Sequence, residues 1–186
     1  MMGGHAVCVV DANVLLNLAT PVVDDRSNAP SGADPLKVLL VTYDVHVPAS
    51  VLGEITDATG SGDLLSAAAD LVLQASRHLT THDVEGQIDG PLEYGLDQGE
   101  SEGIWLANDL DADLFVTDEF NSTNYLFVNL ALNDRNILFT TPHILCTFAT
   151  ADVLAPEYVD AVLTYYSETK GWDQQYVSQL RRRYIS

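Results

Sequence analysis

The stretch that decides the fold is VCVVDANVLL, residues 7–16. Residues 7–10 are small or β-branched apolar residues, and such a run is typical of a strand that is buried on both faces. The apolar run after Asn13 predicts a helix, which puts Asp11 at the carboxyl end of the strand. Ligand sites in open α/β sheets lie at that edge. By itself, however, the stretch is explained equally well if Asp11 or Asn13 merely caps the helix.

The rest of the chain alternates between predicted strands and predicted helices. Further strands are expected at residues 45–47, 80–84, 114–116 and 137–139. Helices are expected at residues 35–41, 48–55, 64–77, from Gly99, within 121–132, at 142–149, and twice within 156–184 with a break at Gly171. Residues 20–34 are rich in Pro, Asp, Ser, Asn and Gly, which predicts an exposed loop. This order predicts an α/β protein with a three-layer α/β/α fold around a central parallel sheet.

The composition of the chain is strongly acidic. Its 186 residues include 27 Asp and Glu against 8 Lys and Arg, a formal net charge of -19. Because 47% of the residues are hydrophobic, there is enough apolar material for a core, and the acids are expected to coat a folded surface. Lysine is limited to Lys37 and Lys170. This bias is typical of halophilic proteins, whose surface self-repulsion is screened by salt.

Nothing in the sequence predicts a membrane-bound or exported protein. No apolar run approaches the roughly 20 residues of a membrane span, and residues 1–10 lack the basic start of a signal peptide. Cys8 and Cys146 lie in apolar stretches without metal-ligand spacing, so they are predicted to be small buried side chains rather than a disulfide or a zinc site. A cytoplasmic protein without a membrane partner is expected.

Four carboxylate residues lie at positions that the fold could bring close together. Asp11 and Asp118 follow predicted strands, while Glu54 and Glu102 lie in early turns of predicted helices. If they converge, their mutual repulsion opposes folding unless a cation joins them. Oxygen ligands favour Mg²⁺ or Mn²⁺ over zinc, and the scattered histidines offer no pair that zinc would prefer.

The segments around these acids resemble a known family. VVDANVLLNL, VPASVLGEI, GESEGIWLAND and VTDEFN look, in that order, like the acidic motifs of the PIN-domain family, the ribonuclease fold shared by the VapC-type toxins. The resemblance covers residues 7–149. It implies that residues 1–150 form a PIN-like nuclease domain and that residues 151–186 form a C-terminal helical extension packed on it.

The resemblance also implies roles for individual residues. The implied catalytic and metal-binding residues, in chain order, are Asp11, Glu54, Glu102 and Asp118. Asn13 and Thr117 are implied as polar support.

The third acid of the set has two candidates, Glu100 and Glu102. They are two residues apart on a helix and cannot face the same way. Glu102 is preferred because the apolar residues after it fit the core face, whereas Glu100 is interpreted as a partner of the helix dipole or as a second ligand. Glu119 and Asn121, beside Asp118, are weaker candidates whose alternative is exposed surface.

The activity that the resemblance implies is metal-dependent endoribonuclease cleavage of RNA, with hydrolysis of phosphodiester bonds by one or two Mg²⁺ or Mn²⁺ ions. A toxin of this type would act on RNA, form a homodimer and be covered by an antitoxin protein. RNA binding is opposed by the net charge, because few basic residues are available to replace counterions. The basic run Arg181–Arg183 is interpreted as a helix end favoured by the helix dipole, with nucleic-acid contact as the alternative.

Two other functions compete with the nuclease. Aspartyl-phosphate phosphatases also carry D-x-[DN] after their first strand, but they need a lysine against the phosphate. Lys37, within an apolar helix, and Lys170, in the C-terminal tail, are not expected to fill that place. The second alternative is a non-catalytic PIN scaffold that binds metal or RNA as a regulatory module, because ligand residues alone do not establish turnover.

Overall fold

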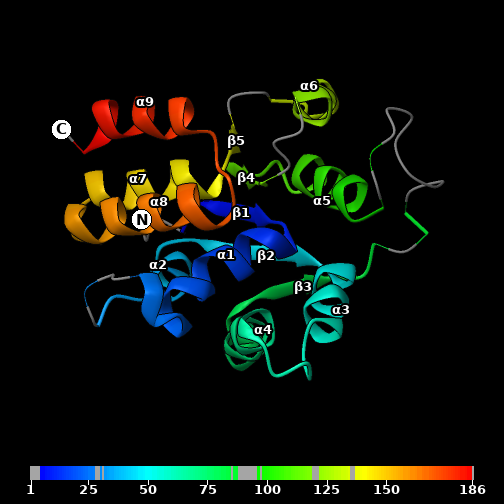
Figure 1. The fold of residues 1–186 in the computed structure, drawn as a ribbon. Helices are drawn as coiled ribbons and strands as arrows, with labels where there is room; N and C mark the ends of the chain where they lie inside the picture. Colours follow the sequence, from blue (N-terminus) through cyan, green and yellow to red (C-terminus); the bar gives the residue numbers. More distant parts are fainter. Residues whose placement is uncertain are drawn as a thin grey trace.

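The computed structural model describes residues 5–27, 30, 32–84, 86–87, 96, 98–118, 122–134 and 137–185. Within them, five parallel strands form one sheet in the order β3-β2-β1-β4-β5 (Figure 1). The strands are β1 (Val7–Val10), β2 (Asp44–Pro48), β3 (Thr80–His82), β4 (Leu114–Val116) and β5 (Leu138–Phe139). The chain builds the sheet from β1 to β3 in one direction and then crosses back to add β4 and β5 on the other side of β1.

Helices cover both faces of this sheet. Between β1 and β3 lie α1 (Ala12–Val23), α2 (Pro35–Thr42), α3 (Ala49–Asp57) and α4 (Leu64–Ala75). After β3, β4 and β5, respectively, come α5 (Gln98–Asp109), α6 (Ser122–Ala131) and α7 (Thr141–Thr150). The C-terminal segment forms α8 (Pro156–Thr169) and α9 (Gln174–Tyr184), and short 3-10 helices occur at Asp25–Ser27 and Ser76–His78.

Side-chain caps explain where several helices begin. Asp34, Asp63, Thr140 and Asp173 each accept a hydrogen bond from the backbone N–H three residues further on. These side chains satisfy backbone donors that the first helical turn leaves without intrahelical partners. The helix predicted at residues 35–41 is therefore confirmed, and it begins at an Asp34 cap followed by Pro35.

Alternating residues of the central strands face opposite helical layers. Cys8 and Val10 of β1 belong to a buried cluster that includes side chains of α1 to α4 and of α7 to α9. Val9 and Phe115 belong to a second cluster, formed with residues of α5 and α6. Burial of both faces explains why β1 consists entirely of apolar residues. The predicted three-layer α/β/α fold is confirmed.

The segment 20–34 differs from the predicted exposed loop. Helix α1 continues to Val23, with Pro21 buried near its end. Proline has no N–H to donate to the carbonyl four residues earlier, which here belongs to Asn17. The hydroxyl of Tyr166 in α8 donates to that carbonyl instead, from 149 residues away. Composition could not predict this, because the compensating donor comes from the far end of the chain.

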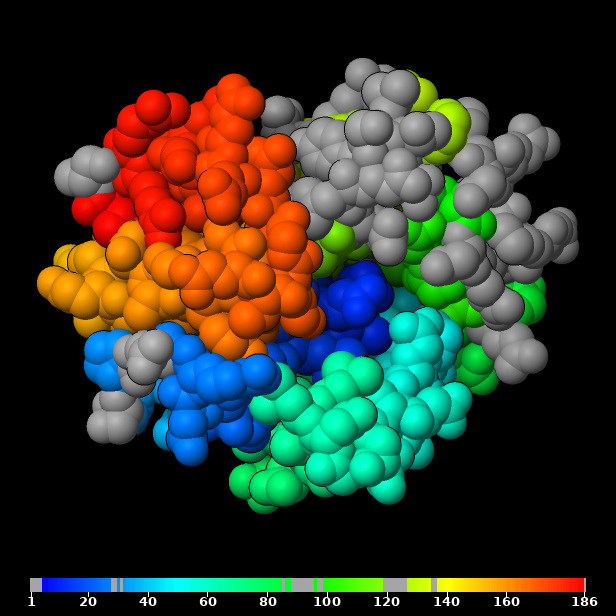
Figure 2. Space-filling view, viewed as in Figure 1, coloured from blue at the N-terminus to red at the C-terminus, as the bar shows by residue number. Residues whose placement is uncertain are grey.

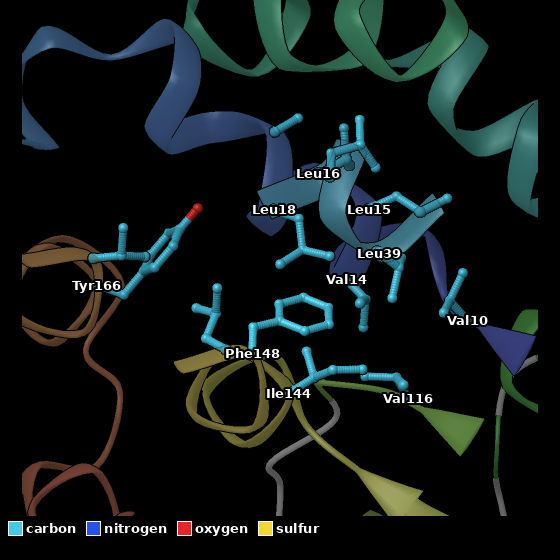
Figure 3. Close-up of a cluster of buried hydrophobic side chains, with 14 of the residues drawn as sticks. Val10, Val14, Leu15, Leu16, Leu18, Leu39, Val116, Ile144, Phe148 and Tyr166 are labelled. Atoms are coloured by element: carbon cyan, nitrogen blue, oxygen red, sulfur yellow. The ribbon is translucent and has the colours of Figure 1, made fainter. Parts of the chain in front are cut away.

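The C-terminal helices share the core of the sheet domain. Figure 3 shows Tyr166 of α8 with its hydroxyl directed toward α1, and Phe148 of α7 among the side chains of Val14 and Leu18. Tyr166 is fully buried. Residues from α8 and α9 thus belong to the same buried cluster as the central strands.

The arginine run at the end of α9 has a structural contact. Nε of Arg181 lies 2.7 Å from Oδ1 of Asp160, and its guanidinium also donates to the hydroxyl of Thr164. Both partners belong to α8, so Arg181 ties the two C-terminal helices together.

Both cysteines are free and buried, as predicted. Burial raises the pKa of the Cys8 thiol and raises that of Cys146 to about 12. Neither is a reactive thiolate at neutral pH. None of the helices in the described parts of the chain is both long and apolar enough to cross a membrane.

Candidate functional site

The centre of the candidate site is the point where β1 and β4 end side by side. Asp11 follows β1, and its backbone N–H donates to the carbonyl of Val116 in β4 at 3.1 Å. Oδ1 of Asp11 accepts from the N–H of Ala12 at 2.6 Å, so this residue caps α1. Its other oxygen, Oδ2, accepts from the hydroxyl of Thr117 at 3.5 Å. Asp11 therefore caps the helix and also faces the carboxyl edge of the sheet, where strand order reverses and ligands bind in this class of fold.

Asp118 is held by three hydrogen bonds from two elements. Its Oδ2 accepts from Nδ2 of Asn17 in α1 at 2.6 Å and from the hydroxyl of Thr141 in α7. Its Oδ1 accepts from the backbone N–H of Thr141 at 2.8 Å. Burial raises the pKa of Asp118, and these bonds and the nearby charge of Lys170 act against that shift. The carboxylate is thus fixed in direction by the middle of α1 and the first residue of α7.

Lys170 completes this group and was missed by the sequence-based argument. The ammonium of Lys170, just after α8, donates to Oδ1 of Asn17. The same amide donates to Asp118 and so bridges the acid and the ammonium. Burial lowers the pKa of Lys170, and the charge of Asp118 opposes this shift. The sequence did not predict that Lys170 lies near Asp118; that it does not face a phosphate on Asp11 stays a prediction.

The sequence contains no local signal for that placement. Lys170 and Asn17 are 153 residues apart, and Asn17 sits in an apolar helix where it looks like an isolated polar residue. Only the docking of α8 on α1 brings them together. Asn17 itself is 4% exposed, and its side chain is satisfied by Asp118 on one side and Lys170 on the other.

A pocket of about 820 Å³ opens beside these residues. In Figure 2 the start of α1, in dark blue, lies at the bottom of a hollow next to α8 in orange. Residues from four parts of the chain line the pocket: Asn13, Asn17, Asp118, Thr140, Pro142, Lys170, Gly171, Trp172, Asp173 and Tyr176. Of the residues predicted for the site, Asn13 and Asp118 thus share one pocket. Its volume is in the range of small-molecule sites.

The predicted glutamates lie on α3 and α5. Glu102 is 3% exposed, and its Oε2 accepts from the hydroxyl of Ser50 in the first turn of α3. Glu54 lies on the exposed side of α3, and Glu100 is half-buried in the first turn of α5. Glu102 is thus the more buried of the two candidates for the third acid, and its role as a ligand stays a prediction. Glu119 and Asn121 lie outside the described residues.

Comparison with known proteins assigns no family. No family model matches the chain, and no curated protein or solved structure matches it. The PIN-domain resemblance therefore stays a prediction that rests on the four acidic segments.

The side chains at this edge of the sheet limit how a divalent cation could be held. Among the residues that the structure describes, no three Asp, Glu, His or Cys side chains are grouped so that they could hold one metal ion. A closed cage of protein ligands therefore does not fit. Mg²⁺, however, usually keeps several waters and is bound by one or two carboxylates together with substrate phosphates. Asp11, beside the hydroxyl of Thr117, fits that more open arrangement, and the four-ligand assignment stays a prediction.

Two histidines that are scattered in the sequence meet in the structure. Nδ1 of His46 in β2 lies 2.8 Å from Nε2 of His82 in β3, and their rings stack at 5.0 Å. Burial lowers the pKa of His82, and the charge of His46 adds to this effect. A third ligand is not grouped with them within the described residues, so they are interpreted as a polar contact between neighbouring strands.

Proposed function

We propose that the protein is a metal-dependent endoribonuclease that hydrolyses phosphodiester bonds in single-stranded or looped RNA. The observation that carries this proposal is the arrangement at the ends of β1 and β4. There Asp11 accepts from Thr117, and Asp118 lies in a pocket that also contains the ammonium of Lys170. A carboxylate for a hard cation and a side-chain ammonium for a phosphate are the groups that phosphodiester chemistry uses.

Each residue has a proposed part in the reaction. Thr117 orients the carboxylate of Asp11, while Asn17 holds Lys170 near Asp118 and fixes the direction of its charge. Asp11 would hold a hydrated Mg²⁺ or Mn²⁺ ion together with the substrate phosphate, and that ion would activate water and neutralise the leaving oxygen. The resemblance implies Glu54, Glu102 and Asp118 as further ligands, but no three of the described acids are grouped for one ion, so the proposal depends on Asp11 and on the ligands that substrate and water supply.

The test is cleavage of a fluorescent single-stranded RNA with Mn²⁺ or Mg²⁺ at high salt. Loss of a carboxylate that holds the ion should reduce the rate at least about 100-fold, because such an ion contributes several kcal/mol of charge stabilisation. We expect this loss for Asp11→Asn and no change for Asp57→Asn, an exposed acid at the end of α3. Equal cleavage by wild type and Asp11→Asn would reject the proposed site.

The position of Lys170 supports a second candidate, an aspartyl-phosphate phosphatase. Such an enzyme needs a lysine against the phosphate, and Lys170 lines the pocket together with Asn13, the third residue of the D-x-N segment. In this case Asp11 would be the nucleophile. Incubation with acetyl phosphate or p-nitrophenyl phosphate should then give a phosphoprotein that is stable to acid quenching, is cleaved by hydroxylamine and is lost in Asp11→Asn. RNA cleavage without phosphoprotein would favour the nuclease.

Further expectations concern partners and location. We propose that the protein is cytoplasmic, forms a homodimer and, if it is a toxin, is neutralised by a small antitoxin protein. Light scattering of the purified chain measures the dimer directly. Metal or RNA binding without cleavage or phosphoprotein would instead favour the non-catalytic regulatory module.

A further inference from the structure

The segment between α8 and α9 forms one side of the pocket and is held firmly in place. Gly171 has a φ of +66°, a conformation suited to glycine, which lets the chain turn at the end of α8. After it, the Trp172 ring stacks on Tyr166 with ring centres 4.4 Å apart. The hydroxyl of Tyr176 is hydrogen-bonded to the hydroxyl of Thr140 at 2.8 Å. These contacts fix the side chains that face the pocket from the C-terminal segment.

Lys170 presents a positive charge on this side of the pocket. An ammonium has three donors, and among the described residues Asn17 is the side chain that receives a hydrogen bond from it. The ammonium is partly buried at its contact with Asn17, while the residue as a whole keeps contact with solvent. The nearby carboxylate of Asp118 already accepts three hydrogen bonds, from Asn17 and from Thr141. The ammonium is therefore oriented by the protein and keeps donors for an anion that enters the pocket.

Tyr176, an aromatic residue, lines the same pocket. It is half-buried and lies at the start of α9, and its hydrogen bond to Thr140 restricts the ring. Proteins that bind single-stranded nucleic acids commonly combine a cation for the backbone with an aromatic ring for the base. The pocket contains both, and its volume of about 820 Å³ is large enough for a nucleotide.

We propose that this pocket is a nucleotide subsite in which Lys170 binds a phosphate and the base of that nucleotide lies against Tyr176. Asn17 acts as the positioning residue because it holds the ammonium. The subsite deepens the proposed ribonuclease function by assigning the C-terminal segment to substrate binding. Because recognition uses an ammonium and a ring, it does not require a divalent cation.

The test measures mononucleotide binding in the presence of EDTA. The indole N–H resonance of Trp172, recorded in a Trp105→Phe background, reports on the pocket by NMR. We expect 5′-AMP to shift this resonance with a Kd in the millimolar range or tighter, and ribose 5-phosphate to bind more weakly. Lys170→Met should weaken 5′-AMP binding by about tenfold or more, corresponding to about 1.4 kcal/mol.

The only other lysine of the chain supplies a matched control. Lys37 lies beside a different pocket, so Lys37→Met should bind 5′-AMP as the wild type does. Tyr176→Ala should bind 5′-AMP no better than ribose 5-phosphate, whereas Tyr176→Phe keeps the preference for the base. If Tyr176→Ala does not fold, the comparison of the two ligands on the wild type tests the contact with the base.

The outcomes test the proposed nucleotide subsite and the proposed ribonuclease function independently. No shift with 5′-AMP, equal binding by Lys170→Met and wild type, or equal binding of 5′-AMP and ribose 5-phosphate would overturn the subsite. Metal-dependent RNA cleavage accompanied by such a result would leave the proposed function intact. Binding of 5′-AMP that depends on Lys170, with no RNA cleavage by the wild type, would support the subsite and reject the nuclease.

Discussion

At the residue scale, the contact between Pro21 and α8 shows how a helix tolerates a proline. Pro21 leaves the carbonyl of Asn17 without its usual donor, and the buried hydroxyl of Tyr166 supplies one. A buried carbonyl that loses its hydrogen bond costs more than the bond itself contributes, because the group stays out of water. Because of the proline in α1, the carbonyl of Asn17 therefore needs the hydroxyl of Tyr166 as its hydrogen-bond donor.

The first prediction concerns this hydroxyl. Tyr166→Phe should lower the free energy of unfolding by about 1–3 kcal/mol, since it leaves a buried carbonyl unsatisfied. The measurement is urea unfolding followed by circular dichroism. In a Pro21→Ala background, residue 21 regains an N–H for Asn17, so the same substitution should cost clearly less. An equal cost in both backgrounds would show that the tyrosine acts only through packing.

The second prediction concerns the pH dependence of the Asp24 contact. Hydrogen bonds from Arg26, opposed by burial and helped by the hydroxyl of Tyr165, lower the pKa of Asp24 from 3.8 to about 2. A carboxylate with a lowered pKa stabilises the fold fully above the unfolded value and loses this effect as the pH falls through the folded value. The stabilisation should therefore disappear between about pH 4 and pH 2.

The measurement compares the free energy of unfolding of wild type and Asp24→Asn across this pH range. At pH 5 the variant should be less stable by about 1.5–3 kcal/mol, the contribution of hydrogen bonds to a charged group, and the difference should shrink as the pH approaches 2. Asp25→Asn, at the exposed neighbouring position, is the control. A difference between wild type and Asp24→Asn that does not change with pH would contradict the assigned contact.

At the scale of elements, α5 packs closely on β4 through a glycine. A Cβ atom at Gly103 would lie 3.1 Å from Cε2 of the Phe115 ring, whereas one at Gly53 in α3 would meet nothing within 4 Å. Both glycines lie inside helices, where alanine is the better helix former. Alanine substitutions at the two positions therefore distinguish the effect of helix propensity on stability from the effect of packing.

The third prediction follows from this pair of glycines. Gly53→Ala should stabilise the protein by about 0.5–1 kcal/mol through helix propensity. Gly103→Ala should destabilise it by about 1–3 kcal/mol, because the ring of Phe115 has to move within a packed layer. Thermal unfolding of both variants shows which substitution raises the melting temperature and which lowers it. Stabilisation by Gly103→Ala would mean that α5 can move away from the sheet at little cost.

At the scale of the whole molecule, the net charge of -19 should make stability depend on salt. The folded chain concentrates its negative charges, and the screening length falls from about 10 Å at 0.1 M salt to about 3 Å at 1 M. We expect the melting temperature to rise by about 10 °C or more as KCl increases from 0.1 M to 3 M, since several kcal/mol of repulsion is removed.

A charge variant provides the control for this fourth prediction. Exchanging the exposed acids Asp57, Asp70 and Glu168 for lysine reduces the repulsion without touching the core. The variant should gain stability at low salt and depend less steeply on KCl. A wild-type melting temperature that does not rise with salt would reject the halophilic interpretation of the composition.

Local patterns were sufficient for most of the elements. The strands follow from short apolar runs. The helix starts at Asp34 and Asp63 and the break at Gly171 each depend on residues within one helical turn of that position. The continuation of α1 through Pro21 did not follow from composition, because its compensating donor lies in α8. The prediction therefore failed where a distant residue supplied a hydrogen bond that was missing locally.

The sequence by itself determined the parallel α/β architecture and the place of Asp11 at the end of the first strand. Both follow from the apolar run of residues 7–10 and from the alternation of strand and helix patterns along the chain. Only the tertiary structure decided that Lys170 and Asn17 join Asp118 in one pocket. The physical reason is that this group is assembled by the packing of α8 against α1, and no local pattern records which distant side chains such packing brings into contact.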